Sequence, residues 1–284
     1  MTTTLPHHVG VVGGGRMGAG IAHAFLAHGC SVTVVEADDA AAAAAHDRIL
    51  GHVQASVDRG RFDGTVAEAA SRLTMDSDVG AFAGHELVIE AVPEVPAIKA
   101  EALRNVEATV DDEAWIATNT SSLSIDDLGE QLERPERFCG LHFFNPVPSS
   151  ALVEVVIGAR TSREVRDTAS SWVRALGKTP IVVSDSPGFA SSRLGVAIAL
   201  EAIRMVEEGV ASPEDIDNAM VLGYRFPIGP LALTDIVGLD VRLGIAEYLN
   251  STLGPRFAPP QLMRNMVANG ELGRKSGKGF YDYT

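Results

Sequence analysis

A histidine and a glutamate twelve residues apart could transfer a proton in this chain. His142 stands in Leu141-His142-Phe143-Phe144, and Glu154 interrupts the apolar run Leu152 to Val156. A carboxylate among branched apolar residues costs roughly a few kcal/mol to desolvate unless it is hydrogen-bonded or paired, and His142 is a nearby partner. Such a histidine can act as a general acid or base. A structural His-Glu pair or a satisfied core histidine is the alternative interpretation.

A glycine-rich turn near the N-terminus has the spacing of a dinucleotide-binding loop. The apolar stretch Val9 to Val12 runs into Gly13-Gly14-Gly15-Arg16-Met17-Gly18, which fits G-x-G-x-x-G between a strand and a helix. Glu36 ends the next strand, 21 residues after Gly15, where its carboxylate would bind the ribose hydroxyls of NAD and repel the 2′-phosphate of NADP. FAD binding and a turn without a ligand are the alternatives. Within this motif we assign cofactor contacts to Gly13, Gly15, Met17, Gly18 and Glu36.

A polar segment, Asn119-Thr120-Ser121-Ser122, follows the apolar run that begins at Trp115. Because ligands of doubly wound folds bind beyond the carboxyl ends of the strands, we expect this segment at the ligand-binding edge of the sheet. The strands that carry His142 and Glu154 are expected to converge on the same edge, where the histidine could face a nicotinamide. Hydroxyl groups in strand-to-helix turns more often cap helices, so the segment alone indicates only a loop.

The elements that must position these residues alternate between strand and helix up to about Asp185, which is typical of a parallel sheet covered by helices. Strands are predicted at His8 to Gly13, Ser31 to Glu36, Arg72 to Met75, Leu87 to Val92, Trp115 to Thr120, Arg137 to Phe144, Leu152 to Ile157 and Ile181 to Ser184. Helices are predicted at Arg16 to His28, Asp38 to Arg59, Ala97 to Thr109 and Ser162 to Leu176. With the segment Thr65 to Arg72, the second helix is expected to form a helical hairpin.

Strand patterns end after Ser186-Pro187-Gly188. Helices are predicted beyond this point at Phe189 to Glu208, Pro213 to Leu222, Thr234 to Leu253 and Pro260 to Asn269. We therefore predict an α/β fold of Rossmann type with a mostly parallel sheet and a C-terminal all-helical domain. The NAD-binding domain is expected to span residues 1–185, and the helical domain for substrate binding and dimerisation residues 186–284.

Composition limits the kinds of partner. The formal net charge of −14 argues against nucleic-acid binding, because phosphate neutralisation needs a basic face. No apolar run approaches the roughly 20 residues that span a bilayer, and the N-terminus lacks a signal-peptide profile, so we expect no membrane association and a cytoplasmic location. Cys30 and Cys139 lack metal-ligand spacing and are expected to be reduced core thiols, with no metal site.

Several segments, taken in their order and spacing, resemble the L-3-hydroxyacyl-CoA dehydrogenase family, of the short-chain 3-hydroxybutyryl-CoA type. The resemblance extends over essentially the whole chain. It implies NAD as cofactor, an acyl-CoA substrate and a homodimer formed through the helical C-terminal domain. The segments that carry it are Gly13 to Gly18, Val88-Ile89-Glu90-Ala91-Val92, Asn119-Thr120-Ser121-Ser122-Leu123, His142-Phe143-Phe144-Asn145-Pro146-Val147-Pro148, Leu152-Val153-Glu154-Val155, Pro187-Gly188-Phe189 and Gly273-Arg274-Lys275-Ser276-Gly277-Lys278-Gly279-Phe280-Tyr281.

The resemblance also implies roles for individual residues. The family's catalytic histidine and glutamate match His142 and Glu154, and its substrate-binding serine matches Ser121. Its cofactor-contacting glutamate and lysine match Glu94 and Lys99, and Asn119 is assigned to the cofactor as well. Asn145 matches a pocket asparagine. Arg59-Gly60-Arg61 resembles a lysine-glycine-lysine stretch that meets the coenzyme A phosphates, and the spacing favours Arg59 as the contact.

Two departures from the family pattern concern the substrate pocket. Ser192 stands where the family usually has an asparagine, in Ala190-Ser191-Ser192-Arg193. Ser149, Ser150 and Ala151 replace a bulkier Val-Met-Lys segment, so the pocket is expected to admit an acyl chain longer or more polar than butyryl. The alternative is that neighbouring side chains fill the space and the specificity stays short-chain.

The sequence thus predicts reversible NAD-dependent oxidation of the L-3-hydroxyl group of a 3-hydroxyacyl-CoA to the 3-ketone. A related dehydrogenase of a free hydroxy acid or sugar acid is one alternative. An NAD-binding structural protein without turnover is the alternative from another class, because fold alone does not decide function.

Overall fold

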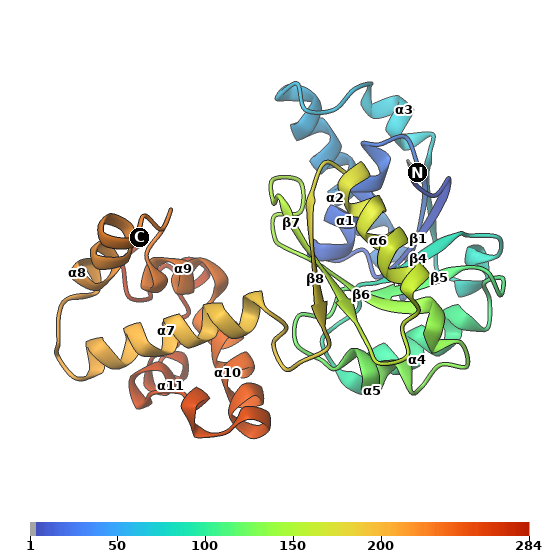
Figure 1. The fold of residues 1–284 in the computed structure, drawn as a ribbon. Coiled ribbons are helices and arrows are strands. Elements are labelled where there is room, and N and C mark those ends of the chain that lie inside the picture. Colours follow the sequence, from blue (N-terminus) through green and yellow to red (C-terminus); the bar gives the residue numbers. More distant parts are fainter. Residues whose placement is uncertain (1–3, 284) are drawn as a thin grey trace. The chain divides into compact units, whose positions relative to one another are not determined.

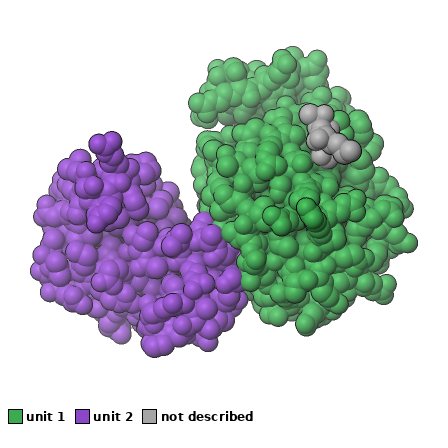
Figure 2. Space-filling model, viewed as in Figure 1, with its two compact units in different colours: residues 1–185 green, residues 186–284 purple. Residues whose placement is uncertain are grey.

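The computed structural model describes residues 4–283 of a chain that divides into two compact units, residues 1–185 and residues 186–284 (Figures 1 and 2). We call them the N-terminal unit and the C-terminal unit. Within residues 4–283, no helix has both the length and the apolar character needed to cross a membrane.

The N-terminal unit is built on one eight-stranded sheet with the strand order β3-β2-β1-β4-β5-β6-β7-β8 (Figure 1). Strands β1 to β6 are parallel, β7 is antiparallel to β6, and β8 is parallel to β7. The order reverses between β1 and β4, which is the point where Rossmann folds bind dinucleotides. The predicted fold class is confirmed. The strands are β1 (His8–Val12), β2 (Ser31–Val35), β3 (Leu73–Asp76), β4 (Leu87–Glu90), β5 (Trp115–Thr118), β6 (Phe138–Phe143), β7 (Leu152–Ile157) and β8 (Thr179–Ser184).

The eight predicted strands are present, with bounds that differ from the prediction by at most two residues. The direction of β7 corrects one expectation, because His142 and Glu154 do not meet at converging strand ends. They are direct cross-strand partners in the antiparallel pair β6–β7. The short connection, residues 144–151, explains the direction, since a parallel crossover needs about a dozen residues or more.

Helices flank this sheet. Helix α1 places nearly all its residues in the core, where they join Val9 and Val11 of β1 and the buried residues of α6. Helix α2 begins at the N-cap Asp38, whose side chain accepts a hydrogen bond from the Ala41 amide at 2.7 Å. The helices are α1 (Arg16–Leu26), α2 (Asp39–Asp58), α3 (Val66–Ala70), α4 (Pro96–Glu107), α5 (Ile125–Gly129) and α6 (Arg163–Ala175).

The predicted helical hairpin consists of α2 and α3. Its small core contains Val53, Phe62 and Ala69, with Val57 and Val66 packed against them. A reciprocal capping box between Thr65 and Glu68 begins α3.

The C-terminal unit is helical and has its own core, which includes Leu200, Ile203, Leu231, Leu249 and Met263. One predicted helix, Thr234 to Leu253, is wrong in two respects: the first helix begins at Pro230, and Gly238 divides the segment. Gly238 has a φ of 104°, which ends one helix and begins the next. The helices are α7 (Ser191–Glu207), α8 (Pro213–Asn218), α9 (Pro230–Val237), α10 (Leu239–Leu253) and α11 (Gln261–Ala268), with a π-helical turn (Ala219–Gly223) after α8.

Candidate active site

The glycine-rich turn between β1 and α1 has the geometry of an anion site. Gly13 has a φ of 88°, and its amide donates to the Val35 carbonyl at 2.8 Å. A Cβ atom at Gly18 would lie 1.8 Å from the Gly13 carbonyl oxygen, so only glycine allows this approach of helix to strand. A Cβ atom at Gly15 would have no atom within 4 Å, which leaves the backbone accessible to a ligand. Helix α1 begins without a side-chain cap, and its first amides can therefore bind phosphate oxygens.

Glu36, directly after β2, is fixed at this turn. One carboxylate oxygen accepts a hydrogen bond from the Gly14 amide at 2.6 Å and the other from the Ala37 amide at 3.3 Å. Arg48 of α2 donates from Nη1 to the Gly14 carbonyl at 2.6 Å. Arg48 was not predicted as a site residue, although it is the only Lys or Arg residue in α2. Met17, the second residue of α1, is partly buried and packs against the core of the unit.

A buried ion pair lies at the end of the neighbouring strand β4. Glu90 is fully buried, and its carboxylate accepts hydrogen bonds from Lys99 Nζ at 2.8 Å, the Val92 amide at 2.7 Å and Thr118 Oγ1 at 2.6 Å. Lys99 is also buried, and its ammonium group lies 3.2 Å from a carboxylate oxygen of Glu94. The structure thus places Lys99 within a protein network, and its contact with the cofactor stays a prediction.

Glu94 connects the loop after β4 with the loop after β5. One of its carboxylate oxygens accepts hydrogen bonds from Thr120 Oγ1 at 2.6 Å and from the Ser121 amide at 2.8 Å. The half-exposed Ser121 is therefore held by its backbone beside Glu94. Two assigned residues thus come together at the carboxyl edge of the parallel strands.

His142 and Glu154 form a buried hydrogen-bonded pair. His142 Nδ1 lies 2.7 Å from Glu154 Oε2, and the two residues are 5% and 0% exposed. The Phe144 ring lies 4.4 Å from the imidazole, centroid to centroid. Asn119 Oδ1 accepts a hydrogen bond from the Phe143 amide at 2.9 Å, which ties the loop after β5 to the strand that carries His142. A carboxylate on Nδ1 fixes the orientation of the ring.

The loop between β6 and β7 is held by Lys178, whose ammonium group donates to the carbonyls of Val147 and Ser150, each at 2.6 Å. Its burial lowers the pKa of Lys178. Asn145 in this loop is exposed, as is Ser149. The loop's own serines add two backbone contacts: Ser149 Oγ donates to the Pro146 carbonyl at 3.3 Å, and Ser150 Oγ accepts a hydrogen bond from the Leu152 amide at 3.4 Å.

Two further substrate candidates belong to other elements of the chain. Arg59 is exposed and is the C-cap residue of α2. Ser192 belongs to the C-terminal unit, where it lies in the first turn of α7. The structure thus brings together the glycine turn with Glu36, and His142 with the loops of Glu94, Asn119 and Ser121, all within the N-terminal unit.

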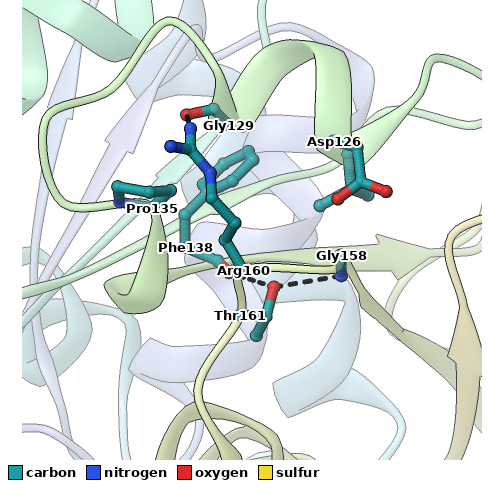
Figure 3. Close-up of a pocket in the computed structure, with 8 residues that line it drawn as sticks. Asp126, Gly129, Pro135, Phe138, Gly158, Arg160 and Thr161 are labelled. Atoms are coloured by element: carbon teal, nitrogen blue, oxygen red, sulfur yellow. Dashed lines mark hydrogen bonds between the residues drawn. The ribbon is translucent and has the colours of Figure 1, made fainter.

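The unit also contains a small pocket near the first residue of β6 and the end of β7 (Figure 3). This is the sheet edge opposite to the carboxyl ends of the parallel strands. Its polar groups bond to one another: Arg160 donates to the Gly129 carbonyl at 2.9 Å, and Thr161 to the Phe138 carbonyl at 2.8 Å. We assign no ligand to it. Among residues 4–283, no group of three or more His, Cys, Asp or Glu residues is arranged to hold a metal ion.

Family models and relatives match nearly the whole chain. The model described as 3-hydroxyacyl-CoA dehydrogenase, NAD binding domain, matches residues 8–186, and that of the C-terminal domain matches residues 188–283. A probable 3-hydroxybutyryl-CoA dehydrogenase of Deinococcus radiodurans is 40% identical over 279 residues, which cover 96% of this chain and 99% of that protein.

Solved structures agree with this match. FadB2 of Mycobacterium tuberculosis superimposes with a TM-score of 0.94 at 40% identity, covering 99% of this chain and 100% of that one. The (S)-3-hydroxybutyryl-CoA dehydrogenase PaaH1 of Ralstonia eutropha has a TM-score of 0.93 at 39% identity, covering 98% and 99% of the two chains.

Proposed function

The chain belongs to the 3-hydroxyacyl-CoA dehydrogenase family, and from this we propose that His142 and Glu154 are the proton-transfer pair of an NAD-dependent enzyme that interconverts L-3-hydroxyacyl-CoA and 3-ketoacyl-CoA. The enzyme class and the cofactor follow from the family. The observation that carries the proposal for the residues is the buried contact of 2.7 Å between the imidazole and the carboxylate.

The glycine turn fits NAD. The open space at Gly15 and the uncapped start of α1 suit a pyrophosphate, and the Glu36 carboxylate, anchored on the Gly14 amide, suits the ribose hydroxyls. Glu94 and Lys99 are proposed to support the cofactor through the network that joins the loops after β4 and β5. When bound, NAD supplies the hydride acceptor, and NADH the donor.

His142 is the proposed acceptor and donor of the substrate's hydroxyl proton. Glu154 holds Nδ1, so the proposal assigns proton transfer to Nε2, which takes the hydroxyl proton during oxidation and returns it during reduction. The imidazolium formed in this step is stabilised by the buried carboxylate. Ser121 and Ser192 are proposed to donate hydrogen bonds to the reacting oxygen, and Asn145 to line the pocket.

The proposal includes coenzyme A recognition by Arg59 and a homodimer formed through the C-terminal unit. The exposed position of Arg59 at the end of α2 supports the first. The second is supported by exposed apolar side chains in that unit, including Leu194, Leu222 and Tyr224. A cytoplasmic location is also proposed, and the free, buried thiols of Cys30 and Cys139 suit a reducing compartment.

A direct assay tests this function. Purified protein is mixed with NAD and either L-3-hydroxybutyryl-CoA or free 3-hydroxybutyrate, and NADH formation is followed by absorbance. We expect turnover of the thioester, with His142→Ala as the inactive control. Turnover of the free acid alone would identify a dehydrogenase of free hydroxy acids, and NAD binding without any turnover would identify a structural role.

A further inference from the structure

A buried arginine in the C-terminal unit has an orphaned polar atom. Arg242 lies in α10 and is only 6% exposed. Its Nε atom is buried and has no hydrogen-bond partner among residues 4–283, and its guanidinium forms no ion pair with the acidic side chains of this part of the chain. Desolvation lowers the pKa of Arg242 to about 10. Because burial of an unpaired charge is unfavourable, Arg242 is well suited to receive an anion from outside the chain.

A glycine in helix α7 leaves room for this guanidinium. Gly195 lies inside α7, where a glycine is unfavourable relative to alanine. A Cβ atom at Gly195 would lie 3.0 Å from Arg242 Nη1, closer than side chains normally pack. The missing side chain thus lets the guanidinium reach the surface of α7. A larger residue would push it away.

The position along α7 indicates which part of a substrate Arg242 would meet. Gly195 follows Ser192 by three residues, so the two share a helix face, separated by a rise of about 4.5 Å. Ser192 is the residue that we assign to the 3-oxygen of the substrate. In an extended acyl chain, the carbon three bonds beyond C3 lies roughly 4 Å away. A group on C6 would therefore lie level with Gly195 and Arg242.

We propose that Arg242 binds a carboxylate at the far end of the acyl chain, so that the preferred substrates are CoA esters of 3-hydroxy dicarboxylic acids, with six carbons as the best fit. A guanidinium matches a carboxylate with two parallel hydrogen bonds, and burial strengthens such bonds. This inference rests on the proposed function and specifies its substrate class.

Two substrates with the same number of acyl carbons isolate the contribution of the terminal carboxylate. One is 3-hydroxyhexanoyl-CoA and the other the six-carbon 3-hydroxyacyl-CoA that ends in a carboxylate. We expect wild-type kcat/KM to favour the carboxylate roughly 10- to 100-fold, the contribution typical of a hydrogen-bonded charge. Arg242→Met should bring this ratio close to one, mainly by raising KM for the ester that ends in a carboxylate. Gly195→Leu should reduce it while the arginine is retained. Arg256→Met, which removes an exposed arginine of the same unit, is the control and should leave the ratio unchanged.

Several results would overturn the inference. A wild-type preference for the uncharged ester would do so, as would equal losses on both esters in Arg242→Met. Dissociation of a dimer by Arg242→Met with the preference intact would assign the arginine to a subunit interface. If Arg242→Met does not fold, the wild-type ratio and Gly195→Leu decide. If neither six-carbon ester nor 3-hydroxybutyryl-CoA is turned over, the proposed function is refuted instead.

Discussion

A buried histidine makes the stability of the N-terminal unit depend on pH. His23 of α1 is 4% exposed, and its Nε2 atom lies 2.9 Å from Ser56 Oγ of α2. Its Nδ1 atom is buried without a hydrogen-bond partner among the described residues. Burial, with smaller effects of His52 and Lys178, lowers the pKa of His23 from 6.5 to about 4. The folded state therefore holds this imidazole neutral where the unfolded chain would protonate it.

The size of the effect follows from the two pKa values. Below pH 6.5 the unfolded state binds a proton that the folded state does not, so stability falls as the pH drops from 6.5 towards 4 and is fully present above 6.5. Between pH 7.5 and 4.5, the contribution of His23 to the free energy of unfolding falls by about 2.5 kcal/mol. His52 and His85, whose pKa values burial also lowers, act in the same direction.

Tryptophan fluorescence provides the assay, because the two tryptophans of the chain, Trp115 and Trp172, both lie in the N-terminal unit. Urea unfolding would be followed at several pH values between 7.5 and 4.5 for wild type and His23→Gln. Glutamine cannot titrate and can still bond Ser56. We expect the pH-dependent loss to be smaller in His23→Gln by about 2.5 kcal/mol.

His7→Gln is the control, because His7 is exposed. This variant should follow the wild-type curve. If His23→Gln and wild type lose the same free energy over this pH range, His23 is not the group that burial keeps neutral, and the reasoning is refuted.

Four other substitutions test the site. His142→Ala should lower kcat by roughly 10²- to 10⁴-fold with NADH affinity preserved, and Glu154→Gln should lower it less and shift the pH profile of kcat/KM; full activity of His142→Ala would refute the mechanism. NAD should be preferred over NADP, because the Glu36 carboxylate repels a 2′-phosphate. Glu36→Ser should bring the Kd values for NADH and NADPH, measured by fluorescence of the reduced cofactors, closer together. Equal Kd values in wild type would contradict the role of Glu36. Arg59→Glu should raise KM for the CoA ester with little change in KM for NAD. An unchanged KM for the CoA ester would mean that Arg59 is an exposed residue at a helix end that does not contact coenzyme A.

Local pattern was enough to predict the strands and the glycine turn. Alternating or consecutive valine residues define β1 and β2, and the bounds follow from where these residues stop. The direction of β7 was predictable in principle from the short connection between Phe143 and Leu152, whereas apolar patterning alone gives no direction. The break at Gly238 depends on a positive φ, which a glycine permits but does not require.

Contacts between distant residues were harder to predict. Arg48 and Gly14 are 34 residues apart, and no periodicity relates them. Arg242 and Gly195 are notable only once α7 and α10 are seen side by side. Glu90 is different, because it interrupts an apolar run just as Glu154 does, and the same desolvation argument points to a partner. The sequence indicates that a partner is needed and does not say which cation supplies it.

The two buried glutamates show how burial can serve either the fold or the chemistry. Glu90 receives an ammonium, a hydroxyl and an amide from the protein, so its charge is balanced by groups that no reaction step alters. Loss of that ammonium would leave a buried charge uncompensated, at a cost of about 3 to 5 kcal/mol in stability. Glu154 instead faces an imidazole, whose charge changes when it accepts a proton. In the proposed reaction, Glu154 would hold the ring that takes the proton, so its loss would lower the rate of proton transfer. Replacement of Glu90 should therefore appear in unfolding curves, and replacement of Glu154 in the pH dependence of turnover.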